Sequence, residues 1–101
     1  YTGFKPAFVM VKQFDSTGGW PMWDNARSDG SSTPPGHNVV NSVVYAQDNN
    51  AETNSDNSSS IVDILSNGFK LRGVSGNSNA DGGDYIYYAV ASHPFKYATA
   101  R

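Results

Sequence analysis

The 101-residue sequence contains no cysteine, so no disulfide can hold this small chain together. It has only two histidines, which is too few side chains for a single chain to build a zinc site. A chain of this length has room for one domain, and we expect residues 1–101 to form it. Its stability must come from a hydrophobic core, from flanking domains or from oligomerisation.

Charged residues are also scarce, at 16% of the chain, and they form no basic run. With a net charge of −2 the chain lacks the positive footprint that nucleic acids require, so we expect no nucleic-acid partner. No apolar run approaches the length that spans a bilayer, so we expect no membrane insertion. Because the chain begins at Tyr1 rather than Met, we expect a fragment or a C-terminal module of a longer protein.

Aromatic residues are plentiful at 13%, which argues against disorder, and short apolar runs alternate with residues that form turns. No segment shows a capped helical period. Four runs predict strands: Ala7–Phe14, Trp20–Asp24, Val39–Ala46 and Asp84–Ser92. The loops between strands are long and polar, at Asn25–His37, Gln47–Ser60 and Val74–Gly83. This pattern predicts an all-β fold of about six antiparallel strands, either a β-sandwich or a small barrel.

A β-hairpin is predicted over Ile61–Arg72, with Asn67-Gly68 as a two-residue type I′ turn. That turn would place Asp63 opposite Arg72, where the two form a cross-strand ion pair. One face of the hairpin would carry only apolar side chains and would point to the core: Val62, Ile64, Phe69 and Leu71.

Residue types also predict where single strands lie in the sheet. Ala7–Phe14 has apolar residues on both faces, which is typical of a central strand that is covered on both sides. Pro21 has no amide hydrogen for a ladder, which favours an edge or a bulge for Trp20–Asp24.

Alternate residues of Asp84–Ser92 share a face of the sheet. We expect Ile86, Tyr88 and Val90 to point into the core, with Tyr85 and Tyr87 on the opposite side.

No constellation of residues points to catalysis. The carboxylates fall mainly in predicted turns, and their spacing singles out no pair of the kind that a glycosidase needs. His37 and His93 flank turns, and the Gly-x-Ser-x-Gly motif of a nucleophile elbow does not occur. We therefore assign no catalytic residue and expect no cofactor.

One segment partly matches a calcium-binding loop, with Asn77, Asn79 and Asp81 as the candidate ligands. The first ligand position holds Asn rather than Asp, and the twelfth holds Tyr88 in place of the bidentate Glu. A glycine-rich turn without a metal is the alternative, and it is the one we favour.

Exposed aromatic rings beside Asn and Asp side chains suit carbohydrate binding. Candidates for such a platform are Trp20 and Trp23 with Arg27 close behind, and the face that carries Tyr85 and Tyr87. The polar ligand-binding candidates are Asn25, Asp48 and Asn50. The alternative is that both tryptophans are buried against the sheet, as large aromatic residues in small domains usually are.

Several stretches in a fixed order resemble a module of tail-fibre-like and other virion proteins of marine tailed bacteriophages. These stretches are Gly3–Lys12, Gly18–Arg27, Ile64–Arg72 and Tyr85–Ala91, and they include Gly-Phe-Lys-Pro-Ala, Leu-Ser-Asn-Gly-Phe-Lys and Tyr-Ile-Tyr. The resemblance extends over nearly the whole chain except Gln47–Ser60. The chain departs from the module in two ways: Val90–His93 replaces the usual Phe-Ala-Glu, and the strand that usually precedes Gly-Phe-Lys-Pro is missing.

The resemblance implies a lectin-like or jelly-roll-like β-sandwich without enzymatic activity, located in the virion. A fibre tip would present the polar loops to a host-surface glycan or protein, and fibres are commonly trimers. The alternatives are a capsid decoration or head-fibre protein that binds other virion proteins, and, less expected, a fragment of a glycan depolymerase.

Overall fold

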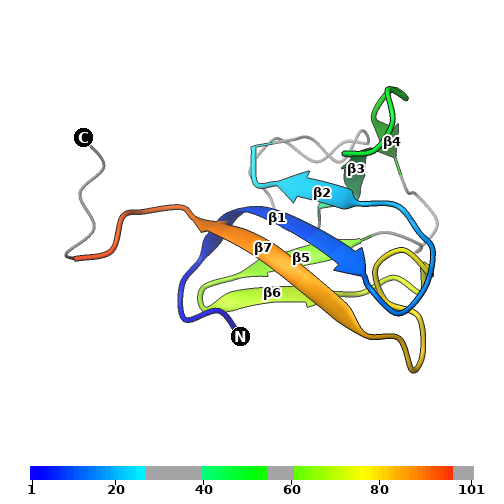
Figure 1. The fold of residues 1–101 in the computed structure, drawn as a ribbon. Helices are drawn as coiled ribbons and strands as arrows, with labels where there is room; N and C mark the ends of the chain where they lie inside the picture. The colour runs from blue at the N-terminus through cyan, green and yellow to red at the C-terminus, as the bar shows by residue number, and fades with distance from the viewer. Residues whose placement is uncertain (27–39, 55–60, 97–101) are drawn as a thin grey trace.

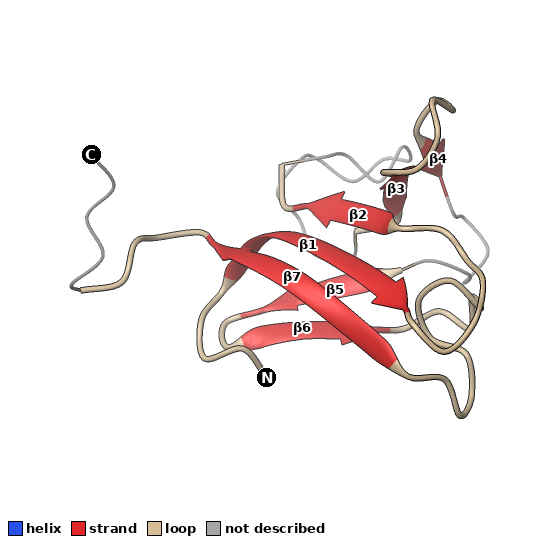
Figure 2. Cartoon of the chain, viewed as in Figure 1, coloured by secondary structure: helices blue, strands red, loops and turns tan. Residues whose placement is uncertain are grey.

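The computed structural model describes residues 1–26, 40–54 and 61–96, and in these ranges all the regular structure is β. Five strands form one antiparallel sheet in the order β4-β3-β2-β1-β7, and β5 and β6 form a second (Figure 1). Figure 2 shows loops between the strands and no helix in the described ranges. The strands are β1 (Pro6–Gln13), β2 (Pro21–Asp24), β3 (Ser42–Tyr45), β4 (Thr53–Asn54), β5 (Val62–Leu65), β6 (Gly68–Leu71) and β7 (Tyr85–Ala91). The predicted antiparallel β-sandwich is confirmed.

The core lies between the two sheets. Val9 and Val11 point into it from β1, because alternate side chains of a strand share a face. Val40 and Val62 form a bridge between the sheets through reciprocal backbone hydrogen bonds of 2.8 and 3.0 Å. The buried apolar cluster consists of Val9, Val11, Trp23, Val40, Val43, Val62 and Ile64.

β1 is the central strand that its sequence predicts, with β2 on one side and β7 on the other. The sequence predicts that both faces of this strand are covered, but only the inner face is. The outward-pointing residues Phe8 and Met10 are only partly buried. The prediction of an edge position for Trp20–Asp24 is wrong, because β2 lies between β1 and β3. Pro21 is the first residue of β2, and pairing with β1 begins only at Met22, so its missing amide hydrogen interrupts no ladder.

The hairpin exists, but its turn is Ser66-Asn67 rather than Asn67-Gly68, because Leu65 pairs with Gly68. The predicted cross-strand partners therefore shift by two residues, which keeps every side chain on its predicted face. The ion pair forms diagonally, with Asp63 Oδ2 and Arg72 Nη1 3.1 Å apart.

The shifted turn is explained by Gly68, which lies against the N-terminal segment of the chain. A Cβ added at Gly68 would lie 3.2 Å from both Thr2 N and Tyr1 Cα. The amides of Thr2 and Gly3 donate to the Asn67 carbonyl at 2.9 and 3.1 Å. The absence of a side chain at Gly68 thus makes room for the N-terminal segment instead of providing a positive φ for the turn.

The predicted orientation of β7 is also wrong. Ile86, Tyr88 and Val90 are 54%, 59% and 42% exposed, whereas Tyr85 and Ala89 pack against the core. Both faces of this strand are apolar, so its sequence alone does not fix which one is inward. The register with β1 decides the orientation, because residues that oppose each other in an antiparallel pair lie on the same side of the sheet.

The predicted polar loops lie between the strands. Val74–Gly83 joins β6 to β7, and the described part of Gln47–Ser60 contains the short strand β4. The described part of Asn25–His37 is limited to residues 25–26, so the remainder of that loop lies outside the described residues.

Candidate functional site

The outward side of the five-stranded sheet carries mostly apolar side chains. The β1 residues Phe8, Met10 and Lys12 oppose Val90, Tyr88 and Ile86 of β7, and Met10 opposes Met22 of β2, which in turn opposes Val44 of β3. We call these eight residues the outer face. Soluble monomers rarely expose large contiguous apolar patches without an interaction to make, so the outer face is the first candidate for a binding surface.

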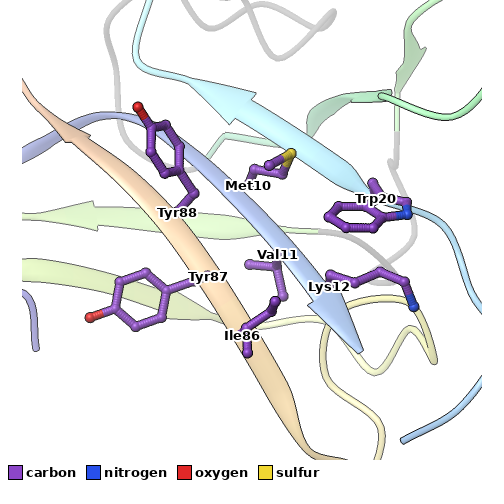
Figure 3. Close-up of a pocket in the computed structure, with 7 residues that line it drawn as sticks. All are labelled: Met10, Val11, Lys12, Trp20, Ile86, Tyr87 and Tyr88. Carbon is purple, nitrogen blue, oxygen red and sulfur yellow. The ribbon is translucent and has the colours of Figure 1, made fainter. Parts of the chain in front are cut away.

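A hollow of about 70 Å³ lies on the outer face beside Trp20. Figure 3 shows the residues that line it, which come from β1, from β7 and from the segment before β2: Met10, Val11, Lys12, Trp20, Ile86, Tyr87 and Tyr88. A second hollow of similar volume is lined by Phe8, Met22, Trp23, Asp24 and Val44. The first hollow combines an aromatic wall with a single cation, and these are residue types that line ligand-binding sites.

The position of Trp20 is fixed by its backbone. Its amide donates to Gln47 Oε1 at 2.8 Å, and its carbonyl accepts from the Ala46 amide at 3.1 Å. The preceding Gly19 has no room for a side chain, because a Cβ there would lie 2.7 Å from the Tyr45 ring. The indole itself is 37% exposed and can therefore contact a ligand.

Lys12 accompanies the indole. Its Nζ lies 5.8 Å from the centroid of the Trp20 ring, within the range of a cation–π interaction. The same ammonium donates to the carbonyls of Gln13 and Ser16, which hold it at the rim. The hollow therefore has a fixed positive charge next to its aromatic wall.

Trp23, the other predicted platform residue, does not reach the surface. It is only 1% exposed and belongs to the core cluster, so the prediction of a platform built from both tryptophans is wrong. The two residues are three positions apart, and the strand alternation that begins at Pro21 turns Trp23 inward. Asn25 is half-buried just after β2, where its amide donates to the Ala7 carbonyl at 2.9 Å. Arg27 lies outside the described residues.

Asp48 and Asn50 are exposed in the loop between β3 and β4. Asp48 Oδ1 accepts from the Asn50 amide at 3.2 Å, and Asp48 Oδ2 accepts from Gln47 Nε2 at 3.4 Å. Gln47 Oε1 also accepts the hydrogen bond from the Trp20 amide, so this loop is linked to the backbone of Trp20 at the hollow. The structure thus connects Trp20, Asp48 and Asn50 through Gln47.

The candidate calcium ligands are used for internal hydrogen bonds. Asn77 Oδ1 accepts from the Gly19 amide at 3.0 Å, and Asn79 Nδ2 donates to the Gly73 carbonyl at 2.6 Å. Within the described ranges, no group of three or more His, Asp or Glu side chains is arranged to hold a metal ion. Asp81 is exposed in the same loop. These contacts support the alternative of a structural turn.

Tyr85 and Tyr87, the other predicted platform, lie on the same side of β7 but differ in exposure. The Tyr85 hydroxyl accepts from the Ala80 amide at 2.8 Å and donates to the Gly76 carbonyl at 3.0 Å, so it anchors the loop before β7. The Tyr87 ring packs edge-on against Phe69, with centroids 5.2 Å apart. The Tyr85 ring therefore serves packing, whereas Tyr87 is 54% exposed and also lines the hollow beside Trp20.

Sequence reasoning missed Met10, Lys12, Ile86 and Tyr88 as residues of the site. A signal for part of it was present, because Lys12 shares a strand face with Met10 and a lysine seldom points into a core. Nothing comparable marks Ile86 or Tyr88, since β7 is apolar on both faces. The described part of the chain also contains no helix long and apolar enough to cross a bilayer.

Comparison with known protein families gives a match over most of the chain. A family model described as "Domain of unknown function (DUF7483)" matches residues 1–94. No curated protein and no solved structure matches the chain. Because the match extends over nearly the entire sequence, the chain belongs to the DUF7483 family.

Proposed function

We propose that the domain is a non-enzymatic binding module of a bacteriophage virion, and that the hollow beside Trp20 binds a host-surface glycan. The observation that carries the proposal is the indole of Trp20, which is exposed at the rim of an apolar hollow and held by its backbone. A rigid aromatic ring can pack against the C–H face of a sugar ring without losing much conformational entropy.

The groups around the indole suit a polyhydroxylated ligand. Lys12 supplies ammonium donors on one side, and Asp48 and Asn50 supply exposed polar groups on the loop that Gln47 ties to Trp20. Sites of this kind fix a ligand through an apolar wall and a few polar groups. The same groups contain no pair of carboxylates across a cleft, which is why we propose binding rather than hydrolysis.

The location in a virion, and the trimer expected for a fibre, rest on the resemblance of the sequence stretches to phage fibre proteins. A symmetric assembly would multiply a weak single-site affinity through simultaneous binding to a repetitive surface. Light scattering of the folded chain tests the trimer independently of any ligand.

A glycan array and binding to whole bacterial cells test the adhesion, with Trp20→Ala as the variant. We expect the unaltered domain to bind a defined glycan and Trp20→Ala to lose on the order of tenfold in affinity, or about 1.4 kcal/mol. Phe14→Ala is the matched control, because Phe14 is an exposed aromatic residue outside the hollow, and it should bind normally. Full affinity in Trp20→Ala would disprove this site, and release of reducing ends from the glycan would disprove the non-enzymatic assignment.

A second candidate function is contact with another virion protein, as in capsid decoration. The exposed apolar side chains of Ile86, Tyr88 and Val90 favour it, because protein interfaces are enriched in aromatic residues and depleted of charge at their centre. Binding to purified capsids, without binding to any glycan or cell, would favour this second function over adhesion.

A further inference from the structure

Within the described residues, β7 is an edge strand without the usual protection against pairing. Among the described residues only β1 pairs with it, and the opposite edge of the sheet, β4, is two residues long. Proteins usually protect edges with short strands, charged residues, proline or bulges. β7 has seven residues, with neither charge nor proline, and the one irregularity in its ladder lies in β1 between Pro6 and Phe8. Figure 1 shows β7 alongside β1 at the margin of the sheet.

The pairing with β1 determines which backbone groups of β7 point outward. The Phe14 amide donates to the Asp84 carbonyl at 3.1 Å, and hydrogen-bonded pairs alternate in an antiparallel ladder. The even-numbered residues of β7 therefore bond to β1. The odd-numbered residues direct their N–H and C=O groups to the free edge: Tyr85, Tyr87, Ala89 and Ala91.

We propose that β7 pairs antiparallel with β7 of a second copy, around a two-fold axis at Tyr88. Tyr88 is the midpoint of the strand, so this register pairs all seven residues and matches odd residues with odd ones. The two sheets would then join into one continuous sheet. A two-fold contact of this kind uses the same surface on both copies.

The side chains of β7 complement each other in that register. On the inner face Tyr85 would oppose Ala91 and Tyr87 would oppose Ala89, so each large ring meets a small residue. On the outer face Ile86 would oppose Val90, and Tyr88 would meet its own symmetry mate. With the axis moved to Tyr87, Val90 and Ala91 of each copy would lose their partners within the strand, and Ile86 would oppose Tyr88. This self-complementarity is why we infer a second copy rather than an unrelated strand.

The pairing does not depend on the proposed glycan site, and its test needs no ligand. Light scattering should give twice the 10.9 kDa mass of one chain, or six times that mass if a three-fold axis is also present. A mass of one or three chains would overturn the proposal.

Tyr88→Cys tests the position of the axis, and the absence of native cysteine removes any background. Residue 88 and its mate would form a non-hydrogen-bonded pair with Cα atoms about 4.5 Å apart, which a disulfide can span. We expect Tyr88→Cys to cross-link two chains under mild oxidation. Val90→Cys is the control and should not cross-link, because its mate would be displaced by roughly 13 Å along the strand. The reverse result would overturn the register.

Charge placed on the edge gives a test that does not require a cysteine variant. Val90→Lys should raise the dimer dissociation constant by about tenfold or more, because a lysine on an edge strand opposes pairing with a strand of another chain. Val74→Lys adds the same charge at an exposed loop position and should leave the mass unchanged. The double variant Ile86→Glu/Val90→Lys should restore the dimer, since each Glu would face a Lys only in the proposed register. Failure of that rescue, in a variant whose circular dichroism shows it to be folded, would refute the pairing.

Discussion

Replacing each tryptophan by alanine should affect stability very differently. Trp23 is 1% exposed within the core cluster, on a strand that lies between two others. Truncation of a buried aromatic residue costs about 3–5 kcal/mol of unfolding free energy, because it removes transfer free energy and leaves a cavity. Domains of this size are stable by only about 5–15 kcal/mol. Trp23→Ala therefore removes a large fraction of the free energy of unfolding.

The Trp20→Ala variant should lose about 1 kcal/mol or less. Its indole is 37% exposed, and its cation–π contact with Lys12 is worth about 0.5–1 kcal/mol at such a site. For a domain of about 100 residues, 1 kcal/mol shifts Tm by roughly 4–8 °C. We thus expect Tm to fall by roughly 12–40 °C in Trp23→Ala and by a few degrees in Trp20→Ala.

Guanidinium denaturation followed by circular dichroism measures both changes, with an unchanged slope indicating that the folded state is the same. Trp23→Phe is the control, because it keeps an aromatic ring in the core and should lose less than Trp23→Ala. Equal losses in the two alanine variants, or a loss below about 1 kcal/mol for Trp23→Ala, would refute the assignment of Trp23 to the core and of Trp20 to the surface.

Three further predictions concern single contacts. Gly68→Ala should lose about 1–3 kcal/mol of unfolding free energy, because the added Cβ would lie 3.2 Å from the N-terminal backbone. Gly76→Ala is the control and should change stability by about 0.5 kcal/mol or less, because no heavy atom lies within 4 Å of its added Cβ. Denaturant titration of both variants measures the difference. The pKa of Asp15 is lowered, chiefly by the hydrogen bond from the backbone amide at residue 84 and then by the Gln13 side chain. Because the pKa of Asp15 is lower in the folded state than in the unfolded state, its ionised carboxylate stabilises the folded state at any pH above the unfolded pKa. This stabilisation is lost as the pH falls through the folded pKa. Below about pH 4, wild type should therefore lose more stability than Asp15→Asn, and parallel pH profiles would contradict this. Arg72→Gln should cost about 0.5 kcal/mol at low salt, because the arginine of this 3.1 Å pair is 53% exposed, and the difference should vanish in 1 M salt.

The sequence predicts the strands better than their arrangement. Each strand predicted outside the hairpin overlaps an observed one, because β-branched and aromatic runs between turn residues have few other stable conformations. The predicted core face of the hairpin is also right, since Val62 and Ile64 are buried on either side of the polar Asp63. Its turn is one residue off because Gly68 serves a contact with residues far away in the chain.

The candidate site was predicted only in part. Trp20 lies at the hollow, and Asp48 and Asn50 lie in a loop tied to it. Strand alternation places two residues three positions apart on opposite faces, but only the packing of β2 in the sheet shows that Trp23 is the tryptophan that points inward. The sequence does not reveal that Tyr88 points outward, because a strand that is apolar on both faces has no polar side to identify as the outer one.

The amino-acid sequence by itself determined the all-β class, the approximate strands and the core face of the hairpin. These follow from local chemistry: alternation, turn residues and β-propensity act within a few residues of each other. Only the tertiary structure decided the order of the strands in the sheet, the inward face of β7 and the position of the hairpin turn. Each of these depends on pairing between segments that are distant in the chain, where the free energy comes from contacts that no single segment contains.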